Sequence, residues 1–242
     1  MPEPVVVDDT DTAKYLPFLL EIRRRLFFTV SIFAVACVIG FIFYEKIIKF
    51  VLNVFHLDGV NIVFTSPFQF INLAIQSSLI VGFIIVFPII VYQLIAFIRP
   101  ALSQREFKNI LFLFPLSLIL FITGFSYGII IMRYTVAIFY EKSVQLDIGN
   151  LLDVSAFISQ TLMTSILLGV AFQFPIIITF LLRTKMVNRN FFAKKRIFFY
   201  AASLIFATFL PPTDILSLVF LFAPLIALFE ATLLFNRLFK HK

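Results

Sequence analysis

Residues 70–98 read FINLAIQSSLIVGFIIVFPIIVYQLIAFI, and this stretch decides the class of fold. It contains no Asp, Glu, Lys or Arg over its whole length. The hydrocarbon core of a bilayer is about 30 Å thick and is crossed by about 20 apolar residues in an α-helix. The segment therefore predicts a transmembrane helix, and Pro88 inside it predicts a bend.

Further apolar segments lie on both sides of this one, at residues 26–44, 110–132, 154–182, 197–210 and 215–236. The chain of 242 residues is 61% hydrophobic and 14% charged, whereas soluble domains are about 45–50% apolar. We therefore expect an all-α, polytopic membrane protein with six transmembrane helices. The last two are expected to be short, the fifth above all, because 14 residues of helix rise only about 21 Å.

The distribution of basic residues predicts the orientation of these helices. Alternate connecting segments place 16 of the 20 lysines and arginines on one side of the membrane and four on the other. The positive-inside rule assigns the basic side, and with it both termini, to the cytoplasm. No internal repeat or linker is visible, so we expect one membrane domain over residues 16–239. A mobile acidic tail (1–15) is expected before it and a short basic tail (240–242) after it.

Several classes of function are excluded by what the sequence lacks. A single cysteine cannot form an intrachain disulfide, and no histidine lies within a predicted span, which leaves no metal or haem site. The seven glycines form neither a phosphate-binding loop nor a dinucleotide-binding turn. The net charge of +7 comes from bases placed between apolar spans, so we expect no nucleic-acid partner. We also expect no catalytic residue, no cofactor and no enzyme activity.

Polar residues inside the predicted spans are costly and need partners. Glu230 lies about 10 Å inside the cytoplasmic boundary, where a carboxylate must be paired, hydrated or protonated. Gln173 lies near the middle of the fourth span and wants a partner on another helix. Such residues most often join helices, and the motif Gly124-x-x-x-Gly128 is likewise typical of close helix packing. The alternative is a solute site of a secondary transporter that uses polar groups of the fourth and sixth helices.

Two carboxylates stand at the predicted cytoplasmic surface, Glu21 before the first span and Glu106 before the third. One interpretation is structural: Glu21 pairs with Arg25 one turn later, and Glu106 complements the positive end of a helix. The other is that two fixed anions bind a ligand that carries two cations. Guanidinium groups suit this role because they stay protonated and present a planar fork to a carboxylate.

Seven motifs are dispersed along the chain: FLLEIRRRL (18–26), TSPF (65–68), PIIVYQLIAFIRPALSQRE (88–106), GVAFQFP (169–175), KKR (194–196), PTD (212–214) and Phe229-Glu230. Through them the sequence resembles a known family, TatC, the polytopic core subunit of the twin-arginine (Sec-independent) protein translocase. The resemblance spans about residues 16–239. The two main departures from the family pattern are Phe18 in place of its usual His and Gln173 in place of its usual acid, and Thr213, where the family often has Pro, is a minor one.

The resemblance implies a receptor that recognises the twin-arginine signal peptides of folded proteins. The residues that it implies for signal-peptide binding are Glu21, Arg23, Pro88, Tyr92, Gln93 and Glu106. Those that it implies for partner contacts or intramembrane polar interactions are Gln173, Pro212, Asp214 and Glu230.

The same resemblance implies partners, an energy source and a location. The partners would be single-span proteins of the TatA and TatB type, in a multimeric complex driven by the proton-motive force. The location would be a bacterial inner membrane rather than a thylakoid membrane. A purely structural membrane subunit is a further alternative, although it gives no reason for the two cytoplasmic glutamates.

Overall fold

The computed structural model describes the backbone of residues 9–238 apart from 56–60, 64, 65, 67, 147–150 and 185. Side chains within that range are described except those of residues 9–19, 54, 61–63, 101, 105, 106, 108, 109, 151, 152, 189 and 238. The elements in chain order are α1 (Asp9–Ile42), α2 (Tyr44–Phe55), β1 (Asn61–Val63), α3 (Gln69–Ile98), η1 (Arg99–Ala101), α4 (Gln104–Leu111), α5 (Leu113–Gln145), β2 (Leu151–Asp153), α6 (Val154–Ala171), α7 (Phe174–Arg183), α8 (Arg189–Lys194), α9 (Arg196–Thr208) and α10 (Ile215–Leu238).

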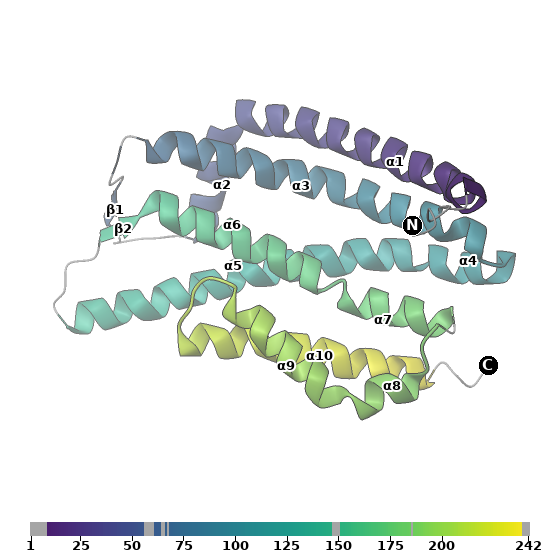
Figure 1. The fold of residues 1–242 in the computed structure, drawn as a ribbon. Helices are drawn as coiled ribbons and strands as arrows, with labels where there is room; N and C mark the ends of the chain where they lie inside the picture. Colours follow the sequence, from purple (N-terminus) through teal and green to yellow (C-terminus); the bar gives the residue numbers. More distant parts are fainter. Residues whose placement is uncertain are drawn as a thin grey trace, which may run out of the picture.

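The helices form a bundle whose long members lie roughly side by side (Figure 1). In the described part of the chain, five helical segments are long and apolar enough to cross a membrane. They are Leu20–Ile42, Gln69–Ile98, Leu113–Gln145, Val154–Arg183 and Ile215–Arg237, and the shorter apolar helix Arg196–Thr208 is the expected fifth member. The nearly all-helical, polytopic fold predicted from the sequence is therefore confirmed. Both α9 and α10 are shorter than α3 and α5, as expected. Helix α10, with 24 residues, is still long enough to cross the bilayer, whereas α9, with 13 residues, is not.

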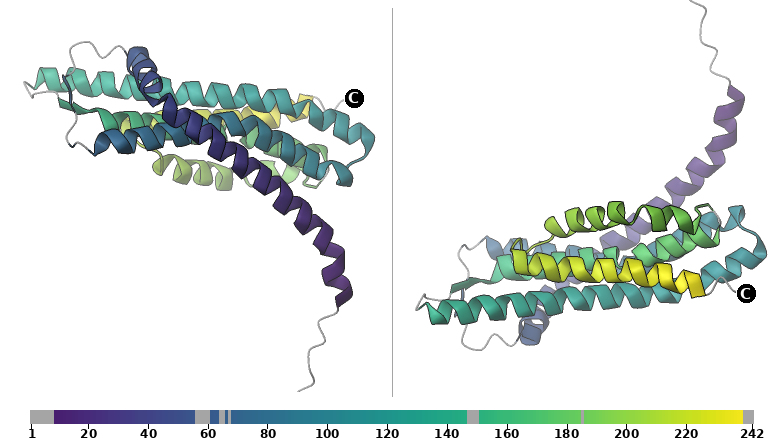
Figure 2. Two further views of the ribbon diagram at one scale, coloured as in Figure 1. Left: turned by 90° about the horizontal axis from the view of Figure 1, so that it is seen from above. Right: turned by 90° about the horizontal axis from the view of Figure 1, so that it is seen from below.

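The start of α1 and the end of α10 lie at the same end of the bundle, as an even number of spans requires (Figure 1). Helix α1 begins at Asp9, inside the segment expected to be a tail, while residues 1–8 and 240–242 lie outside the described residues. Figure 2 shows that α1 crosses the other helices at an angle and that its first turns extend away from them. Its main contact is with α3.

The opposite end of the bundle carries ordered elements outside the long helices. Strands β1 and β2 pair in parallel, with Ile62 opposite Leu152, and join the two long connections. Helix α2 is amphipathic, and its Val51 and Phe55 are buried against side chains of α3 and α6. These tertiary contacts make ordered elements out of segments whose sequence shows no long apolar run.

Helix α5 continues to Gln145, although the apolar run that predicted it ends at residue 132. With 33 residues it is about 50 Å long, so it extends beyond the bilayer. Thr135 is buried in this extension, and its hydroxyl oxygen lies 2.9 Å from that of Ser217 in α10. Packing and hydrogen bonding thus support helix where hydropathy alone ends the span.

Glycines set the close approach of α5 and α6. A Cβ at Gly128 would lie 2.5 Å from the Ser165 Cα, and one at Gly124 would lie 2.7 Å from the Leu168 carbonyl oxygen. A Cβ at Gly169 on α6 would in turn meet the Phe121 ring at 2.8 Å. The prediction that Gly124-x-x-x-Gly128 is a packing motif is confirmed.

Prolines act in two ways. Pro88 and Pro224 lie inside α3 and α10, while Pro175 occupies the first turn of α7, where its missing N–H costs no hydrogen bond. The predicted fourth span is therefore two helices, α6 and α7, which meet at Phe172 and Gln173.

Candidate functional site

A pocket of about 560 Å³ lies between α1 and α3, at the end of the bundle where α1 begins. From α1 it is lined by Glu21, Arg24, Arg25, Phe27, Phe28 and Ser31, and from α3 by Ile89, Tyr92 and Gln93. The pocket combines one carboxylate and two arginines with several aromatic and aliphatic side chains. Its carboxylate can contact a cationic group of a ligand, and its rings can contact an apolar group of the same ligand.

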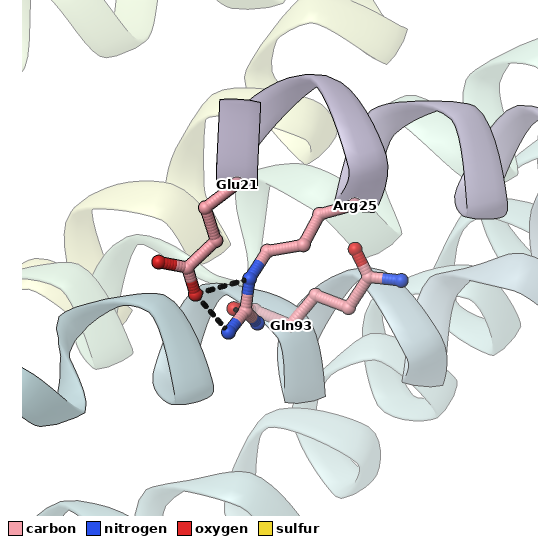
Figure 3. A network of polar contacts seen from close by, with 3 residues as sticks. All are labelled: Glu21, Arg25 and Gln93. Atoms are coloured by element: carbon pink, nitrogen blue, oxygen red, sulfur yellow. Dashed lines mark hydrogen bonds and ion pairs between the residues drawn. The ribbon is translucent and has the colours of Figure 1, made fainter. Parts of the chain in front are cut away.

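Glu21 is the acidic group of this pocket and is already engaged by Arg25. The Glu21 Oε1 atom accepts hydrogen bonds from Arg25 Nη2 at 2.6 Å and from Arg25 Nε at 3.0 Å. Figure 3 shows both contacts converging on this one oxygen, while the second carboxylate oxygen points away from Arg25. The pair is partly exposed, with 41% of the Glu21 side chain and 29% of the Arg25 side chain accessible. The structural interpretation of Glu21, an ion pair one turn along the helix, is thus confirmed.

The same arginine ties α1 to α3. Arg25 Nη1 donates to the backbone carbonyl oxygen of Gln93 at 3.3 Å. The Thr29 hydroxyl lies 3.0 Å from Gln93 Oε1 and 2.8 Å from the Arg25 carbonyl oxygen, within hydrogen-bond distance of both acceptors. Glu21, Arg25 and Thr29 are spaced by four and so share one face of α1. This spacing was the available signal for the role of Thr29, which sequence reasoning missed.

The other residues implied for signal-peptide binding are distributed around this pocket. Tyr92 lines it with 60% of its surface exposed, and its ring packs edge-on against Phe114 at a centroid distance of 6.4 Å. Pro88 lines a separate apolar cavity of about 240 Å³ between α3 and α5. Arg23 is exposed and is not among the residues that line the pocket. The structure therefore brings together Glu21, Tyr92 and Gln93, but not Arg23 or Pro88.

Glu106 lies in α4, which begins shortly after α3 ends, but its side chain lies outside the described residues. Arg25 contacts Gln93 in the last turns of α3. Glu21 and the backbone of Glu106 are thus at the same end of the bundle. The side chain of Phe18 also lies outside the described residues.

Gln173 joins three helices at the break between α6 and α7. Its Oε1 accepts a hydrogen bond from the Ser117 hydroxyl of α5. Its Nε2 donates to the carbonyl oxygens of Ser117, at 3.1 Å, and of Gly169, at 3.3 Å. Ser117 is almost fully buried, with 1% exposed. The contact with α5 confirms the expectation that Gln173 has a partner on another helix.

Replacing Gln173 should therefore change stability in a graded way. Gln173→Leu leaves the buried Ser117 hydroxyl without its acceptor and should lower the free energy of unfolding by about 1–3 kcal/mol. Gln173→Glu keeps that acceptor and, when protonated, one donor, so it should cost less. Thermal unfolding of the purified protein in detergent measures both, and a larger loss for Gln173→Glu would contradict the assignment.

The remaining polar residues stabilise the contact between α9 and α10 and the turn that joins these helices. The Glu230 carboxylate in α10 accepts a hydrogen bond from the Tyr200 hydroxyl, and its Oε2 lies 3.3 Å from Arg196 Nη1. Tyr200 and Arg196 both belong to α9. Asp214 Oδ2 accepts from the Ser217 backbone N–H at 2.8 Å and so caps the start of α10.

Pro212 lies in this same turn, between α9 and α10. The preceding carbonyl, that of Pro211, accepts a hydrogen bond from the Thr164 hydroxyl of α6. The turn is therefore attached to the neighbouring part of the bundle. In the contacts of the described residues, Glu230 and Gln173 are paired within the protein, as helix-joining groups are, whereas Asp214 uses Oδ2 for the cap and its buried Oδ1 has no hydrogen-bond partner.

The fold and the pocket define a class of protein: a multi-span helical membrane protein with a pocket at one end of its bundle that is lined by charged and aromatic side chains. The family model described as Sec-independent protein translocase protein (TatC) matches residues 17–224. The TatCy protein of Bacillus subtilis (strain 168) is 30% identical over 233 residues, which cover 92% of this chain and 88% of that protein. The TatC protein of Aquifex aeolicus (strain VF5) is 28% identical over 228 residues, which cover 93% and 95%. A crystal structure of a twin-arginine translocase receptor, TatC in DDM, matches with a TM-score of 0.79 at 26% identity and covers 90% of this chain and 98% of that one.

The chain belongs to the TatC family. It is a multi-span membrane subunit of the Sec-independent protein translocase, which acts in a complex of membrane proteins, and it is not an enzyme. The secondary-transporter alternative is set aside by this membership.

Proposed function

We propose that this subunit is the receptor for twin-arginine signal peptides and that the pocket between α1 and α3 is where the arginines bind. The observation that carries the proposal is the Glu21 carboxylate, which lines an open pocket with one oxygen directed away from its internal partner (Figure 3). A carboxylate accepts a guanidinium through two parallel N–H···O bonds, which an ammonium cannot make. The pocket thereby favours arginine over lysine.

The apolar lining of the pocket would bind the apolar stretch of the signal peptide. Phe27 and Phe28 are 74% and 56% exposed on α1, and Tyr92 is 60% exposed on α3. They offer aromatic surface on which the apolar stretch of a signal peptide is buried. Glu106 in α4 is the carboxylate proposed for the second arginine, with Arg23 and Pro88 in supporting positions at the edge of the site.

The proposal includes the setting in which the receptor works. The protein would lie in a bacterial inner membrane with both termini in the cytoplasm, which puts the pocket on the side where folded cargo arrives. Single-span partners of the TatA and TatB type would dock near α9 and α10, where Pro212, Asp214 and Glu230 lie, and Gln173 at the break between α6 and α7 is proposed as a further partner-binding or intramembrane polar residue. The complex would contain several copies of each subunit and would use the proton-motive force without a nucleotide.

Site-specific photo-crosslinking tests where the peptide binds. A photoreactive phenylalanine at position 92 should crosslink a labelled twin-arginine peptide in native membranes. The matched control is position 134 in α5, because Tyr134 is 63% exposed and Tyr92 60%, yet Tyr134 lies toward the far end of α5. Equal crosslinking at both positions, or crosslinking at position 134 alone, would contradict the proposed site.

A further inference from the structure

The carboxylate proposed to receive the ligand already holds a guanidinium from the protein itself. Arg25 directs two of its nitrogen donors, Nε and Nη2, at Glu21 Oε1. A third, Nη1, reaches the Gln93 carbonyl oxygen on α3 at 3.3 Å. Arg25 thus already forms a guanidinium–carboxylate contact with Glu21, through one carboxylate oxygen only.

This arrangement leaves a ligand only part of the carboxylate. The paired contact between an arginine and a carboxylate uses both oxygens, and Arg25 occupies Oε1. Only Oε2 is directed away from Arg25 (Figure 3). A lysine ammonium needs one oxygen, but an arginine can form its two parallel bonds only after Arg25 has moved.

The charged side chains that line the pocket also make it harder for a cation to reach Glu21. Among its described lining residues, Arg24 and Arg25 are cationic and Glu21 alone is anionic. The resting pocket therefore does not attract cations in general. Because the pair is partly exposed, it is weak enough for a ligand to displace. The Gln93 carbonyl oxygen remains as an acceptor for the displaced guanidinium.

We infer that Arg25 is an internal competitor of the signal peptide: it occupies Glu21 in the free protein and must be displaced by a ligand arginine before the paired contact forms. The inference rests on the proposed function of the pocket. Its consequence is a lower affinity for the twin-arginine peptide, because part of the binding free energy is used to break the contact between Arg25 and Glu21.

The test is binding of labelled peptides to the purified protein in nanodiscs. Arg25→Gln removes the competing guanidinium and keeps a side chain able to donate to the Gln93 carbonyl oxygen. We expect the twin-arginine peptide to bind about two- to fivefold more tightly, the range for an ion pair of this exposure. A twin-lysine peptide should gain less, because Oε2 is already available to it. Arg25→Lys keeps the charge with fewer donors and should give a smaller gain for the twin-arginine peptide.

Arg24→Gln is the matched control because it removes the same charge from the same pocket without freeing Glu21. It should raise the affinity for both peptides by the same factor. In a Glu21→Gln background, Arg25→Gln should have no further effect beyond that common factor. If the thermal unfolding midpoint of each variant equals that of the unchanged protein, a folding defect is excluded as the cause of a change in affinity.

The outcomes separate this inference from the function on which it rests. If Arg25→Gln weakens the twin-arginine peptide, Arg25 positions Glu21 instead of competing, and the inference is overturned while the receptor function stands. Equal gains for both peptides that persist in the Glu21→Gln background would show a net-charge effect only, and would also overturn it. If Glu21→Gln alone leaves twin-arginine affinity unchanged, the proposed function of the pocket fails.

Discussion

Glu21→Gln is expected to weaken binding of a twin-arginine signal peptide about tenfold or more. A hydrogen bond to a charged group contributes about 1.5–3 kcal/mol, and each 1.4 kcal/mol is a factor of ten in affinity. Glutamine keeps the size of the side chain but offers one acceptor oxygen and no charge. The measurement is a peptide titration of the protein in nanodiscs, at fixed salt because the interaction is screened.

The control for this variant is Glu45→Gln. Glu45 is exposed and lies in the first turn of α2, after the end of α1 and away from the pocket. It should leave the affinity unchanged, while Glu106→Gln in α4 should lower it as Glu21→Gln does. Unchanged affinity for Glu21→Gln would reduce Glu21 to the role of a helix ion pair, and unchanged affinity for Glu106→Gln would remove the second carboxylate from the proposed site.

Gly128→Ala should destabilise the whole bundle. The added methyl group would lie 2.5 Å from the Ser165 Cα and 3.0 Å from the Ser165 backbone nitrogen, so α5 and α6 must move apart. Overpacking of this kind costs about 1–3 kcal/mol, whereas alanine gains at most about 1 kcal/mol over glycine in helix propensity. The clash therefore decides the sign, because backbone atoms cannot give way as a flexible side chain can.

The matched control is Ser126→Ala, on an exposed position of the same helix. Both variants are compared by thermal unfolding in detergent. We expect a lower thermal midpoint for Gly128→Ala and little change for Ser126→Ala. If Gly128→Ala unfolds at the temperature of the unchanged protein, the two helices do not approach as closely as described.

Hydropathy predicted the helices of this protein well wherever burial in lipid is what forms them. The predicted segments at 70–98 and 215–236 match α3 and α10 to within two residues at each end. It could not predict α2, the pairing of β1 with β2 or the extension of α5, because these depend on contacts between distant segments. The division of the fourth span was within reach of the sequence, since Pro175 excludes an unbroken run of helical hydrogen bonds.

The candidate site was predictable as a set of residues but not as an arrangement. A glutamate and an arginine four residues apart predicted the ion pair, and the family motif predicted that Glu21, Tyr92 and Gln93 belong together. Two details depend on how α1 crosses α3. One is which oxygen of Glu21 contacts Arg25, and the other is that Arg25 donates to the backbone carbonyl of Gln93 rather than to its side chain. No pattern in either segment alone encodes that crossing.

One set of four affinities tests whether the Glu21 carboxylate distinguishes a guanidinium group of the signal peptide from an ammonium group. Twin-arginine and twin-lysine forms of one signal peptide are titrated against the unchanged protein and against Glu21→Gln. We predict a clear preference for arginine in the unchanged protein and loss of most of that preference in the variant. An arginine preference of the same size in both proteins would contradict this prediction.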